Sequence, residues 1–519
     1  MQYPGTNLQQ VFNELSITMI TDLLFNKIPT LLAASLLGGC LMIFIYKLTW
    51  KQQISRLGKR SALIPASFMG LSEVYCVLKY AKMNKNREFW AMRFTELQNY
   101  TMELEMLWKR IIFTSEPENI KAVLATQFND FGKGEVFHDS WHEFLGDSIF
   151  STDGELWKGS RALIRPQFIK DRVSDLHIFE NHVQHMISLI PRNGETVDIA
   201  ELFFRFTLDS ATDFLLGESV NSLGTTGEMK FVKAFAQIQQ YQNDVTRLGP
   251  LRVFMPKGNF KENIKILNSF VEPFVKKTLQ LKPEELLEKT ETNYNFLHAL
   301  AGFTRDPKVL RDQLVAVLLA GRDTTAGTLS WCFYELAKRP ECVEILRQEI
   351  LDTVGPDAAP TYAHLKGMKY LQHVMDETLR LYPAVPFNIR VALKDTVLPT
   401  GGGATKLEPV GVPAGTPIAY SALVMQRRKD IFGPDADEFR PERWRNWSPK
   451  PWTFIPFNGG PRICIGQQFA YAEMAYTIVR LFQTFDGVQD RMVVPQFERC
   501  ETTISPGAGV KIALRPVKN

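Results

Sequence analysis

The chain has 519 residues, of which 45% are hydrophobic and 22% are charged, a composition typical of globular proteins with a large buried core. Its 60 basic and 56 acidic residues leave a formal net charge of only +4, which argues against nucleic-acid binding. The six cysteines are scattered and no pair has the CxxC spacing, so they favour a reducing compartment over a secreted disulfide framework.

Residues 28–46 (IPTLLAASLLGGCLMIFIY) carry no charge and are flanked by Lys27 and Lys47. As a helix they would rise about 28 Å, which is close to the thickness of a bilayer core. The preceding segment is too long and too acidic for the basic start of a cleaved signal peptide, and a buried core helix is the remaining alternative. We therefore predict a transmembrane anchor over residues 28–46, preceded by a lumenal N-terminus over residues 1–27.

Basic residues crowd the stretch after the predicted anchor, at positions 47, 51, 56, 59 and 60. The positive-inside rule therefore predicts a single-pass protein whose remaining chain lies in the cytosol. Residues 47–70 are polar and contain Pro65, and we interpret them as a tether. No later stretch is repetitive or linker-like, so we expect residues 71–519 to form one domain.

Helical patterns dominate the rest of the chain. Residues 115–118 (SEPE) are typical of a capped helix start. Residues 308–339 carry a long apolar stripe that ends at an Arg-Pro step, and a second helix is predicted over about 368–381. The Gly- and Pro-rich residues 383–420, and those from Val493 onward, favour short strands and turns. The sequence thus predicts a mainly α chain with a minor β part.

Cys464 has unusual surroundings, because it follows a Gly-rich segment and directly precedes a helical pattern (QQFAYAEMAYTIVRLF). The dipole and free N–H groups of a helix N-terminus stabilise a thiolate, and glycine permits the tight turn that points amides at the sulfur. Arg462, two residues earlier, can reach an acidic group on a cofactor. A structural cysteine in a turn is the alternative, and the joint spacing of Phe, Gly, Arg, Cys and Gly favours a metal ligand.

The spacing FxxGxRxCxG from Phe457 to Gly466 resembles the ligand loop of the cytochrome P-450 superfamily at every fixed position. The resemblance covers residues 60–519 and implies the cytochrome P-450 fold, haem b with Cys464 as the axial ligand of its iron, and a monooxygenase activity on an apolar substrate. It further implies that electrons come from NADPH through a flavoprotein reductase, and that the protein lies in the endoplasmic reticulum membrane.

Two more motifs of that superfamily concern the structure around the cysteine. Glu377 and Arg380 resemble its ExxR, and Arg443 lies in a segment (PERW) that resembles its PERF. Residues at i and i+3 share a helix face, so the acid and the guanidinium can engage a third partner together. An ExxR alone is usually a surface ion pair. In this context the resemblance implies a structural triad of Glu377, Arg380 and Arg443.

Haem carries two carboxylates, which arginine binds in a bidentate manner. Trp157 and Arg161 (WKGSR) match the WxxxR of the superfamily, and Arg390 falls where that superfamily has another propionate-binding arginine. The resemblance therefore implies cofactor contacts from Trp157, Arg161 and Arg390, in addition to Arg462 and Phe457 of the cysteine loop. A solvated side chain is the alternative for each arginine.

Residues 320–325 (AGRDTT) lie in the middle of the long predicted helix and match the oxygen-side pattern of the superfamily, (A/G)Gx(D/E)T(T/S). Glycine and hydroxyl side chains that bond back to the preceding turn favour a local widening of the helix. Splitting an O–O bond requires proton delivery through a hydroxyl group and a nearby acid. The resemblance implies that Thr324 holds the relay water and that Asp323 feeds protons.

Within the superfamily, five segments resemble fungal alkane and fatty-acid terminal hydroxylases: 128–134, 144–150, 320–331, 398–403 and 457–468. By family position the pocket is lined by Phe144, Phe150, Ala320, Val385, Phe387 and Ile504. These side chains suit a long aliphatic, lipid-soluble substrate and its terminal (omega) hydroxylation. Hydroxylation of a polyketide- or terpene-like intermediate, an isomerase or dehydratase without dioxygen, and a non-catalytic haem protein are the alternatives.

Two patterns fall outside this interpretation. His138 and His142 have the i, i+4 spacing of a helical metal pair, but the sequence offers no Glu or Cys to complete the set, so we predict no zinc there. The basic run 427–429 is most simply a solvated patch. Because it lies between the ExxR helix and the cysteine loop, docking of an acidic redox partner is its alternative role.

Overall fold

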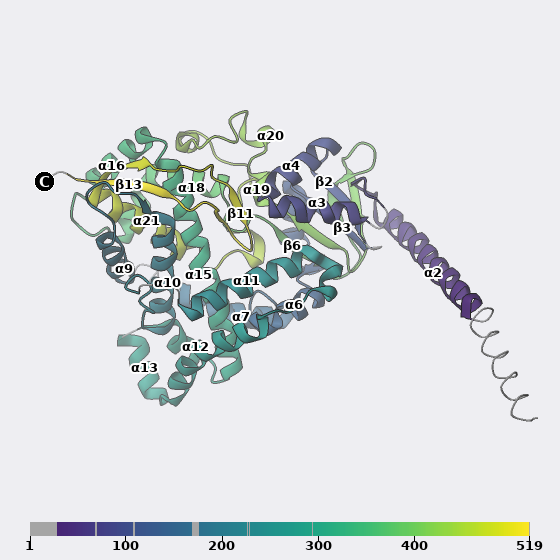
Figure 1. Ribbon diagram of the computed structural model, residues 1–519, viewed down its shortest axis with the longest axis horizontal. Coiled ribbons are helices and arrows are strands. Elements are labelled where there is room, and N and C mark those ends of the chain that lie inside the picture. The colour runs from purple at the N-terminus through teal and green to yellow at the C-terminus, as the bar shows by residue number, and fades with distance from the viewer. Residues whose placement is uncertain are drawn as a thin grey trace, which may run out of the picture.

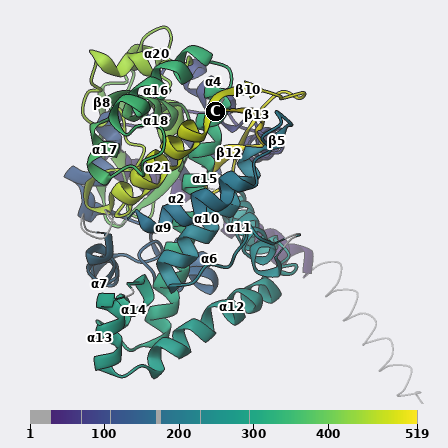
Figure 2. The ribbon, with the colours of Figure 1, turned by 90° about the vertical axis from the view of Figure 1, so that its left-hand side faces the viewer.

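The computed structural model describes residues 28–67, 70–106, 109–168, 176–225, 227, 229–292 and 294–517, without the side chains of 28–36, Cys40, Tyr46, Pro250 and 291–292. The predicted lumenal segment 1–27 lies outside the described residues. Figures 1 and 2 show a mainly helical body with small sheets, which confirms the predicted fold class. A single helix, α2, projects from this body (Figure 1).

The largest sheet has six strands and lies near α3 and α4 (Figure 1). Its spatial order is β1 (Ala62–Leu63), β2 (Thr101–Met106), β3 (Lys109–Thr114), β9 (Pro417–Tyr420), β6 (Asn388–Ala392) and β4 (Phe131–Gly132). A second sheet joins β10 (Phe485–Asp490), β13 (Lys511–Pro516) and β5 (Val197–Asp198). The remaining pairs are β7 (Thr396–Gly402) with β8 (Glu408–Val412) and β11 (Glu498–Cys500) with β12 (Ile504–Pro506). Strands therefore occur in both ranges where the sequence predicts them, and also outside these ranges at β1 to β5 and β10.

Helices cover the rest of the described chain. Before the long central helix they are α3 (Leu71–Lys82), α4 (Asn86–Leu97), α5 (Pro117–Lys121), α6 (Glu135–Leu145), α7 (Gly154–Ile164), α9 (His177–Ser188), α10 (Ile199–Leu216), α11 (Lys230–Leu248), α12 (Phe260–Gln280), α13 (Pro283–Thr292) and α14 (Phe296–Ala301). After it they are α16 (Pro340–Thr353), α17 (Tyr362–Gly367), α18 (Lys369–Leu381), α19 (Ala422–Met425), α20 (Lys429–Phe432) and α21 (Gln467–Thr484). The helix predicted over 368–381 is thus confirmed as α18.

The central helix is α15 (Pro307–Leu336), and its residues contribute to both large hydrophobic clusters of the body. It begins at Pro307, where the side chain of Asp306 accepts the N–H groups of Lys308 and Val309 and so caps the helix. The prediction of a helix over 308–339 is confirmed to within three residues. Because α15 lies between the two clusters, its polar residues face groups from both halves of the body.

The helix that contains the predicted anchor is longer than the apolar segment. α2 (Ile28–Leu57) continues eleven residues past Tyr46, and Ile54 is buried where the helix packs on β8. Within the predicted tether 47–70, residues 47–57 form the end of α2 and residues 62–63 form β1. Among the described residues, no helix is both long enough and apolar enough to cross a membrane.

The predicted capped helix start at residues 115–118 differs in detail. α5 begins at Pro117 with Glu116 as its N-cap residue, and no side chain caps it. The Ser115 hydroxyl is buried without a hydrogen-bond partner among the described residues. The helix then continues as a short π-helical turn, Ala122–Thr126, which packs beside the cysteine loop. The start of the helix was predicted correctly, but the serine cap was wrong.

Candidate active site

Cys464 lies at the end of a loop that leads directly into α21. Its backbone N–H donates to the carbonyl of Phe457 at 3.0 Å, which closes the loop, and the N–H of Gly466 donates to its sulfur. The helix begins at Gln467, so its N-terminal dipole points at the sulfur. The loop therefore has the helix start and the amide contact that a thiolate ligand requires.

The glycines of this loop are needed where other chain segments approach it closely. Gly460 has a φ of +66°, and a Cβ there would clash with the carbonyl oxygen of Leu124 in the π-helical turn. A Cβ on Gly459 would meet the ring of Trp452. Only glycine satisfies both the backbone conformation and the space at position 460, which explains that position of the motif physically.

Glu377, Arg380 and Arg443 meet in one fully or nearly fully buried network. Arg380 binds both oxygens of Glu377 at 2.8 Å, and Arg443 lies 3.4 Å from the same carboxylate. The indole of Trp444 donates to Glu377 at 3.0 Å. Arg380 also donates to the main-chain carbonyls of Gln426, Ala436 and Glu438. Burial makes this set a structural element of the core and not a surface ion pair.

The helix α15 carries Thr324 and Asp323. The Thr324 hydroxyl donates to the carbonyl of Ala320 at 2.7 Å, one turn earlier. α15 is nevertheless continuously α-helical from Pro307 to Leu336, so the predicted widening of residues 320–325 was wrong. Bonding back to the preceding turn satisfies the hydroxyl here without breaking the helical ladder.

Asp323 is buried and held from two directions. The side-chain amide of Gln239, on α11, donates to one carboxylate oxygen at 2.7 Å, and Arg322 lies 3.4 Å from the other. Arg322 in turn lies over the ring of Phe235. Sequence reasoning missed Gln239, because a glutamine on an amphipathic helix gives no signal until the fold brings it to α15.

The predicted pocket residues come from four elements around α15. Phe144 on α6 is fully buried and packs edge-on against Phe235 of α11, with ring centroids 5.6 Å apart. The tip at Ile504 is fixed by a hydrogen bond from its N–H to Ala384 and packs on α15 at Gly327, where a Cβ would meet the Ile504 carbonyl.

The turn that holds Val385 and Phe387 follows Ala384 directly, so the structure brings this turn to the Ile504 tip. Phe387 is half-buried and Ala320 is partly buried. Phe150 and Val385 are exposed. α6 and β12 thus both pack on α15, and the 384–387 turn is joined to β12 through Ala384.

A cluster of cations lies beside the cysteine loop. Arg462 donates to Asp153 and stacks over the ring of Trp157, with its guanidinium 4.6 Å from the ring centroid. Arg390 is buried, and it and Lys133 share the Asn388 side chain as an acceptor. The cluster therefore gathers Lys133, Arg390 and Arg462 around a single nearby carboxylate, Asp153.

The family model described as Cytochrome P450 matches this chain over residues 65–508. That range includes every residue of the site just described. The chain belongs to the cytochrome P450 family. Its relatives include "Cytochrome P450 monooxygenase pvhE" of Talaromyces variabilis, 44% identical over 94% of this chain and 96% of the relative. "Cytochrome P450 52A1" of Candida tropicalis is 46% identical over 75% of each chain, and "Cytochrome P450 52A13" of Debaryomyces hansenii is 40% identical over 86% and 90%.

As a P450 monooxygenase the protein uses haem and receives electrons from NADPH through a reductase, and the predicted family, enzyme class and cofactor are confirmed. When bound, the haem supplies the iron at which dioxygen is activated. Cys464 fits this group, since its thiol is free and exposed and lies at the start of α21. Desolvation raises the pKa of this thiol to about 11, so a cation beside the sulfur is needed to hold the thiolate.

The cation cluster fits the carboxylates of the haem. Burial, Arg390 and Arg462 lower the pKa of Lys133 well below its usual value, and burial lowers that of Arg462 to about 10. Three cations against Asp153 leave two positive charges without a carboxylate partner among the described residues, and haem carries two propionates. The Arg462 Nε is also buried without an acceptor among the described residues. Lys133 and Asp153 were missed, although Lys133 lies in the FNDFGKG segment.

Arg161 lies over the ring of Trp157, with its guanidinium 5.9 Å from the ring centroid. Its guanidinium donates to the carbonyl of Ile463 at 3.1 Å and lies near the sulfur of Cys464, where its charge lowers the pKa of the thiol. The structure therefore puts Arg161 at the cysteine loop, beside the Trp157 ring that Arg462 also contacts.

The basic run 427–429 is not a solvated patch. Arg427 is nearly buried and pairs with Glu498, while Arg428 is buried against Tyr100 and binds Asp430. Only Lys429 of the three is exposed. Two of the three charges are therefore paired with carboxylates of the same chain. These contacts support neither the solvated patch nor the alternative role as a docking surface.

Proposed function

We propose that this P450 hydroxylates the terminal carbon of alkanes or fatty acids at the endoplasmic reticulum membrane. The resemblance of five sequence segments to fungal terminal hydroxylases supports this substrate class. The apolar side chains near α15 are the structural observation that supports it. Phe144, Phe387 and Ile504 offer no charge to a polar substrate. An aliphatic chain directed at the cysteine side of α15 would present its end methyl group for oxidation.

A second candidate function is the oxidation of a polyketide- or terpene-like intermediate in specialised metabolism. The relative pvhE matches more of this chain than the two 52A relatives do, so overall similarity does not favour the 52A group alone. Optical titration of the full-length holoenzyme with straight-chain and polycyclic compounds separates the two candidates. We expect spectral shifts with long alkanes and fatty acids, and shifts produced solely by polycyclic compounds would favour the second candidate.

The proposed haem contacts have different roles. Cys464 is the proposed iron ligand, and Trp157, Arg390 and Arg462, joined by Lys133, are proposed to hold the propionates. Arg161 is proposed to stabilise the charge of the thiolate. Phe457 contributes its carbonyl to the loop and packs on Tyr471, with ring centroids 5.2 Å apart.

Asp323 and Thr324 are the proposed proton-relay residues. Thr324 would hold a water molecule at the oxygen side, and Asp323, oriented by Gln239, would supply it with protons. The Gln239 amide and Arg322 hold the Asp323 carboxylate from two sides, so it keeps a fixed position beside Thr324 in the proposed relay.

Replacement Thr324→Ala removes the hydroxyl and leaves Cys464 and the cation cluster unchanged. We expect haem content and substrate binding to persist, NADPH consumption to continue, product per NADPH to fall about tenfold or more, and hydrogen peroxide to rise, since general acid–base groups contribute factors of this size. Thr328→Ala is the matched control, because Thr328 makes the same bond to the carbonyl one turn earlier, at Thr324. Unchanged coupling in Thr324→Ala, or equal uncoupling in both variants, would contradict the relay.

A membrane anchor is proposed for the first part of α2. The helix leaves the folded body (Figure 1), and large apolar side chains on it are exposed, among them Leu37, Met42 and Phe44. Burial of these side chains in a bilayer removes the free-energy cost of their exposure to water. The basic residues that follow are consistent with a cytosolic catalytic domain.

Deletion of residues 1–46 tests the anchor while keeping Ile54 and its packing on β8. We expect the truncated protein to bind haem and to move largely from the membrane to the soluble fraction, as measured by fractionation and haem absorbance. Deletion of residues 1–27 alone is the control and should leave the protein in the membrane. A 1–46 deletion that folds and stays fully membrane-bound would refute the anchor.

A further inference from the structure

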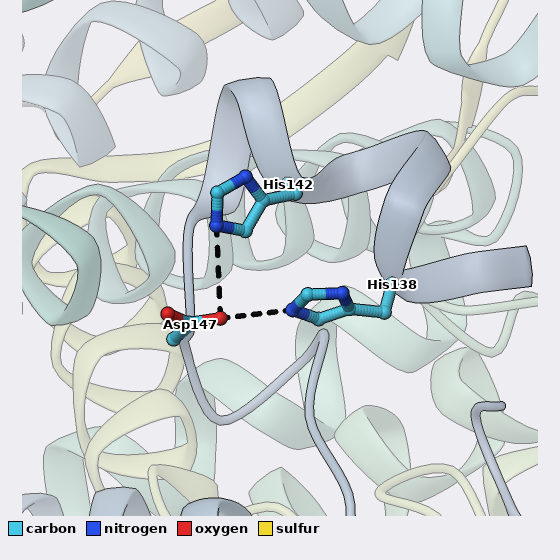
Figure 3. A group of neighbouring side chains, drawn as sticks. All are labelled: His138, His142 and Asp147. Carbon is cyan, nitrogen blue, oxygen red and sulfur yellow. Dashed lines mark hydrogen bonds and ion pairs between the residues drawn. The ribbon is translucent and has the colours of Figure 1, made fainter. Parts of the chain in front are cut away.

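His138 and His142 lie one turn apart on α6, and both point at Asp147 in the loop that follows the helix (Figure 3). The Nε2 of His138 is 2.8 Å from Oδ1 of Asp147, and the Nε2 of His142 is 3.7 Å from the same oxygen. The three ligand atoms lie within 4.8 Å of one another. The fold thus supplies the third side chain that the sequence did not offer to the histidine pair.

These separations match the dimensions of a zinc site. Zinc binds nitrogen and oxygen ligands at about 2.0–2.2 Å in a tetrahedron, which sets neighbouring ligand atoms about 3.3 Å apart. The two measured separations to Asp147 lie on either side of that value. Rotation of the three side chains would bring their ligand atoms to this spacing and let an ion replace the His138–Asp147 hydrogen bond.

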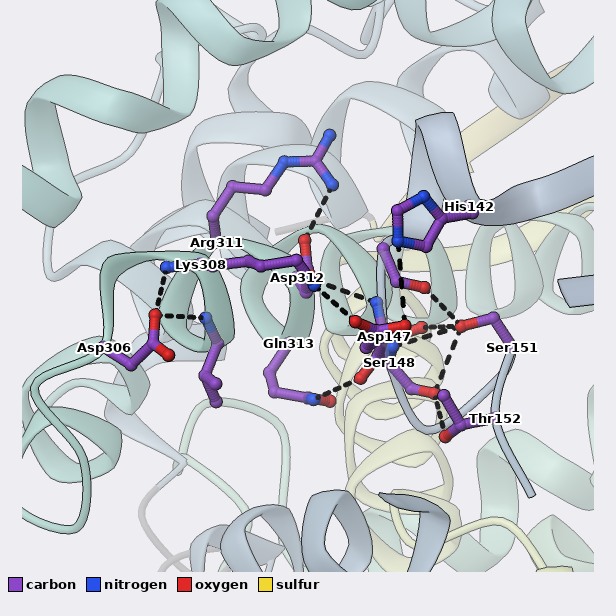
Figure 4. A network of polar contacts seen from close by, with 12 residues as sticks. His142, Asp147, Ser148, Ser151, Thr152, Asp306, Lys308, Arg311, Asp312 and Gln313 are labelled. Atoms are coloured by element: carbon purple, nitrogen blue, oxygen red, sulfur yellow. Dashed lines mark hydrogen bonds and ion pairs between the residues drawn. The ribbon is translucent and has the colours of Figure 1, made fainter. Parts of the chain in front are cut away.

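The surroundings of Asp147 hold it in place for such a role (Figure 4). Lys308 of α15 donates to its other oxygen, Oδ2, and the N–H of Asp147 donates to Asp312 at 2.9 Å. Oδ1 is therefore the oxygen that remains for the two imidazoles. Asp139 lies 3.6 Å from Nδ1 of His138, in the position of a carboxylate that orients a metal-bound imidazole. Asp312 also pairs with Lys308 at 3.0 Å and offsets its charge.

We propose that His138, His142 and Asp147 form a binding site for one Zn²⁺ ion, with water in the fourth position. The three side chains are 32%, 44% and 36% exposed, so an ion can reach them from solvent. A bound ion ties the C-terminal half of α6 to the loop anchored on α15 through Lys308 and Asp312. Phe144 lies on the same half of α6, so the ion fixes the element that carries a proposed pocket residue.

The test uses the full-length haem-loaded enzyme and Zn²⁺ alone, titrated in competition with a chromophoric chelator that absorbs away from the haem bands. We expect the wild type to bind one Zn²⁺ ion per chain more tightly than the chelator allows any others to bind. In His138→Ala and in His142→Ala this ion should be lost, or its affinity should fall at least about tenfold. His185→Ala, on the partly buried face of α9, is the matched control and should bind like the wild type. Haem absorbance verifies that each variant is folded.

Zinc-edge X-ray absorption of the loaded enzyme reports the ligands directly, whatever the variants do to folding. The proposal predicts scattering from two imidazoles and oxygen at about 2.0–2.2 Å. Sulfur scattering would assign the ion to a thiol such as Cys76, and equal zinc affinity in the wild type, His138→Ala and His142→Ala would remove these residues from the site. Either result would overturn the zinc site. The conclusion that the protein is a P450 monooxygenase does not depend on this site and would stand.

Discussion

Replacement of Cys464 by serine is expected to abolish thiolate ligation and with it all monooxygenase activity, because a neutral hydroxyl cannot supply the charge of the thiolate. The loop itself should persist, since it is closed by the backbone N–H of residue 464 and by the glycines at 459 and 460. The measurement is the absorption spectrum of the reduced carbon-monoxide complex, which should lose the Soret band characteristic of thiolate-bound haem.

Cys76→Ser provides the control for this experiment, because Cys76 is a half-buried thiol on α3 that has no part in the loop. It should keep both the band and the activity. A Cys464→Ser protein that retains the thiolate-type band would show that another residue ligates the iron, and the assignment of the cysteine loop would have to be abandoned.

Replacement of Arg380 by alanine should lower the free energy of unfolding by about 3–5 kcal/mol, the cost of breaking a buried ion pair by removing one partner. Glu377 would remain fully buried, and three main-chain carbonyls would lose their donor. Because one of these carbonyls belongs to Gln426, whose side chain accepts the N–H of Ile455 before the cysteine loop, we also expect loss of haem.

Lys158→Ala is the matched control for that experiment. Glu155 and Lys158 form an i, i+3 acid–base pair of the same spacing as Glu377 and Arg380, but both side chains are exposed. Such a pair contributes under about 1 kcal/mol, so denaturant unfolding should barely change. Equal stability of the Arg380→Ala and Lys158→Ala proteins would show that the buried triad is not a structural element.

The parts of the fold that could be predicted depend on local sequence. α15 and α18 were placed to within a few residues by their apolar periodicity and by the prolines that follow, and the start of α21 followed from the cysteine loop. The missed features depend on residues far apart in the chain. Gln239 acquires its role only when α11 packs beside Asp323, 84 positions later.

The environment of charged side chains could not be predicted from the sequence for the same reason. Arg427 and Arg428 look solvated in the sequence, yet the fold buries them against carboxylates that lie up to 312 positions away. His138 and His142 look incomplete as a metal pair, because Asp147 becomes their neighbour only after α6 ends and the loop turns back. Periodicity predicts which face of a helix is buried, but the partners of a polar side chain are set by tertiary packing.

The central claim, terminal oxidation of an aliphatic chain, is tested most directly by analysing the product. Full-length enzyme in vesicles with reductase and NADPH is supplied with a long-chain fatty acid under ¹⁸O-labelled dioxygen, and the product is located by mass spectrometry. The proposal predicts one ¹⁸O atom on the terminal carbon, with product formation dependent on Thr324 and Asp323. Hydroxylation only at carbons within the chain, or no product from alkanes and fatty acids while a polycyclic compound is oxidised, would contradict it.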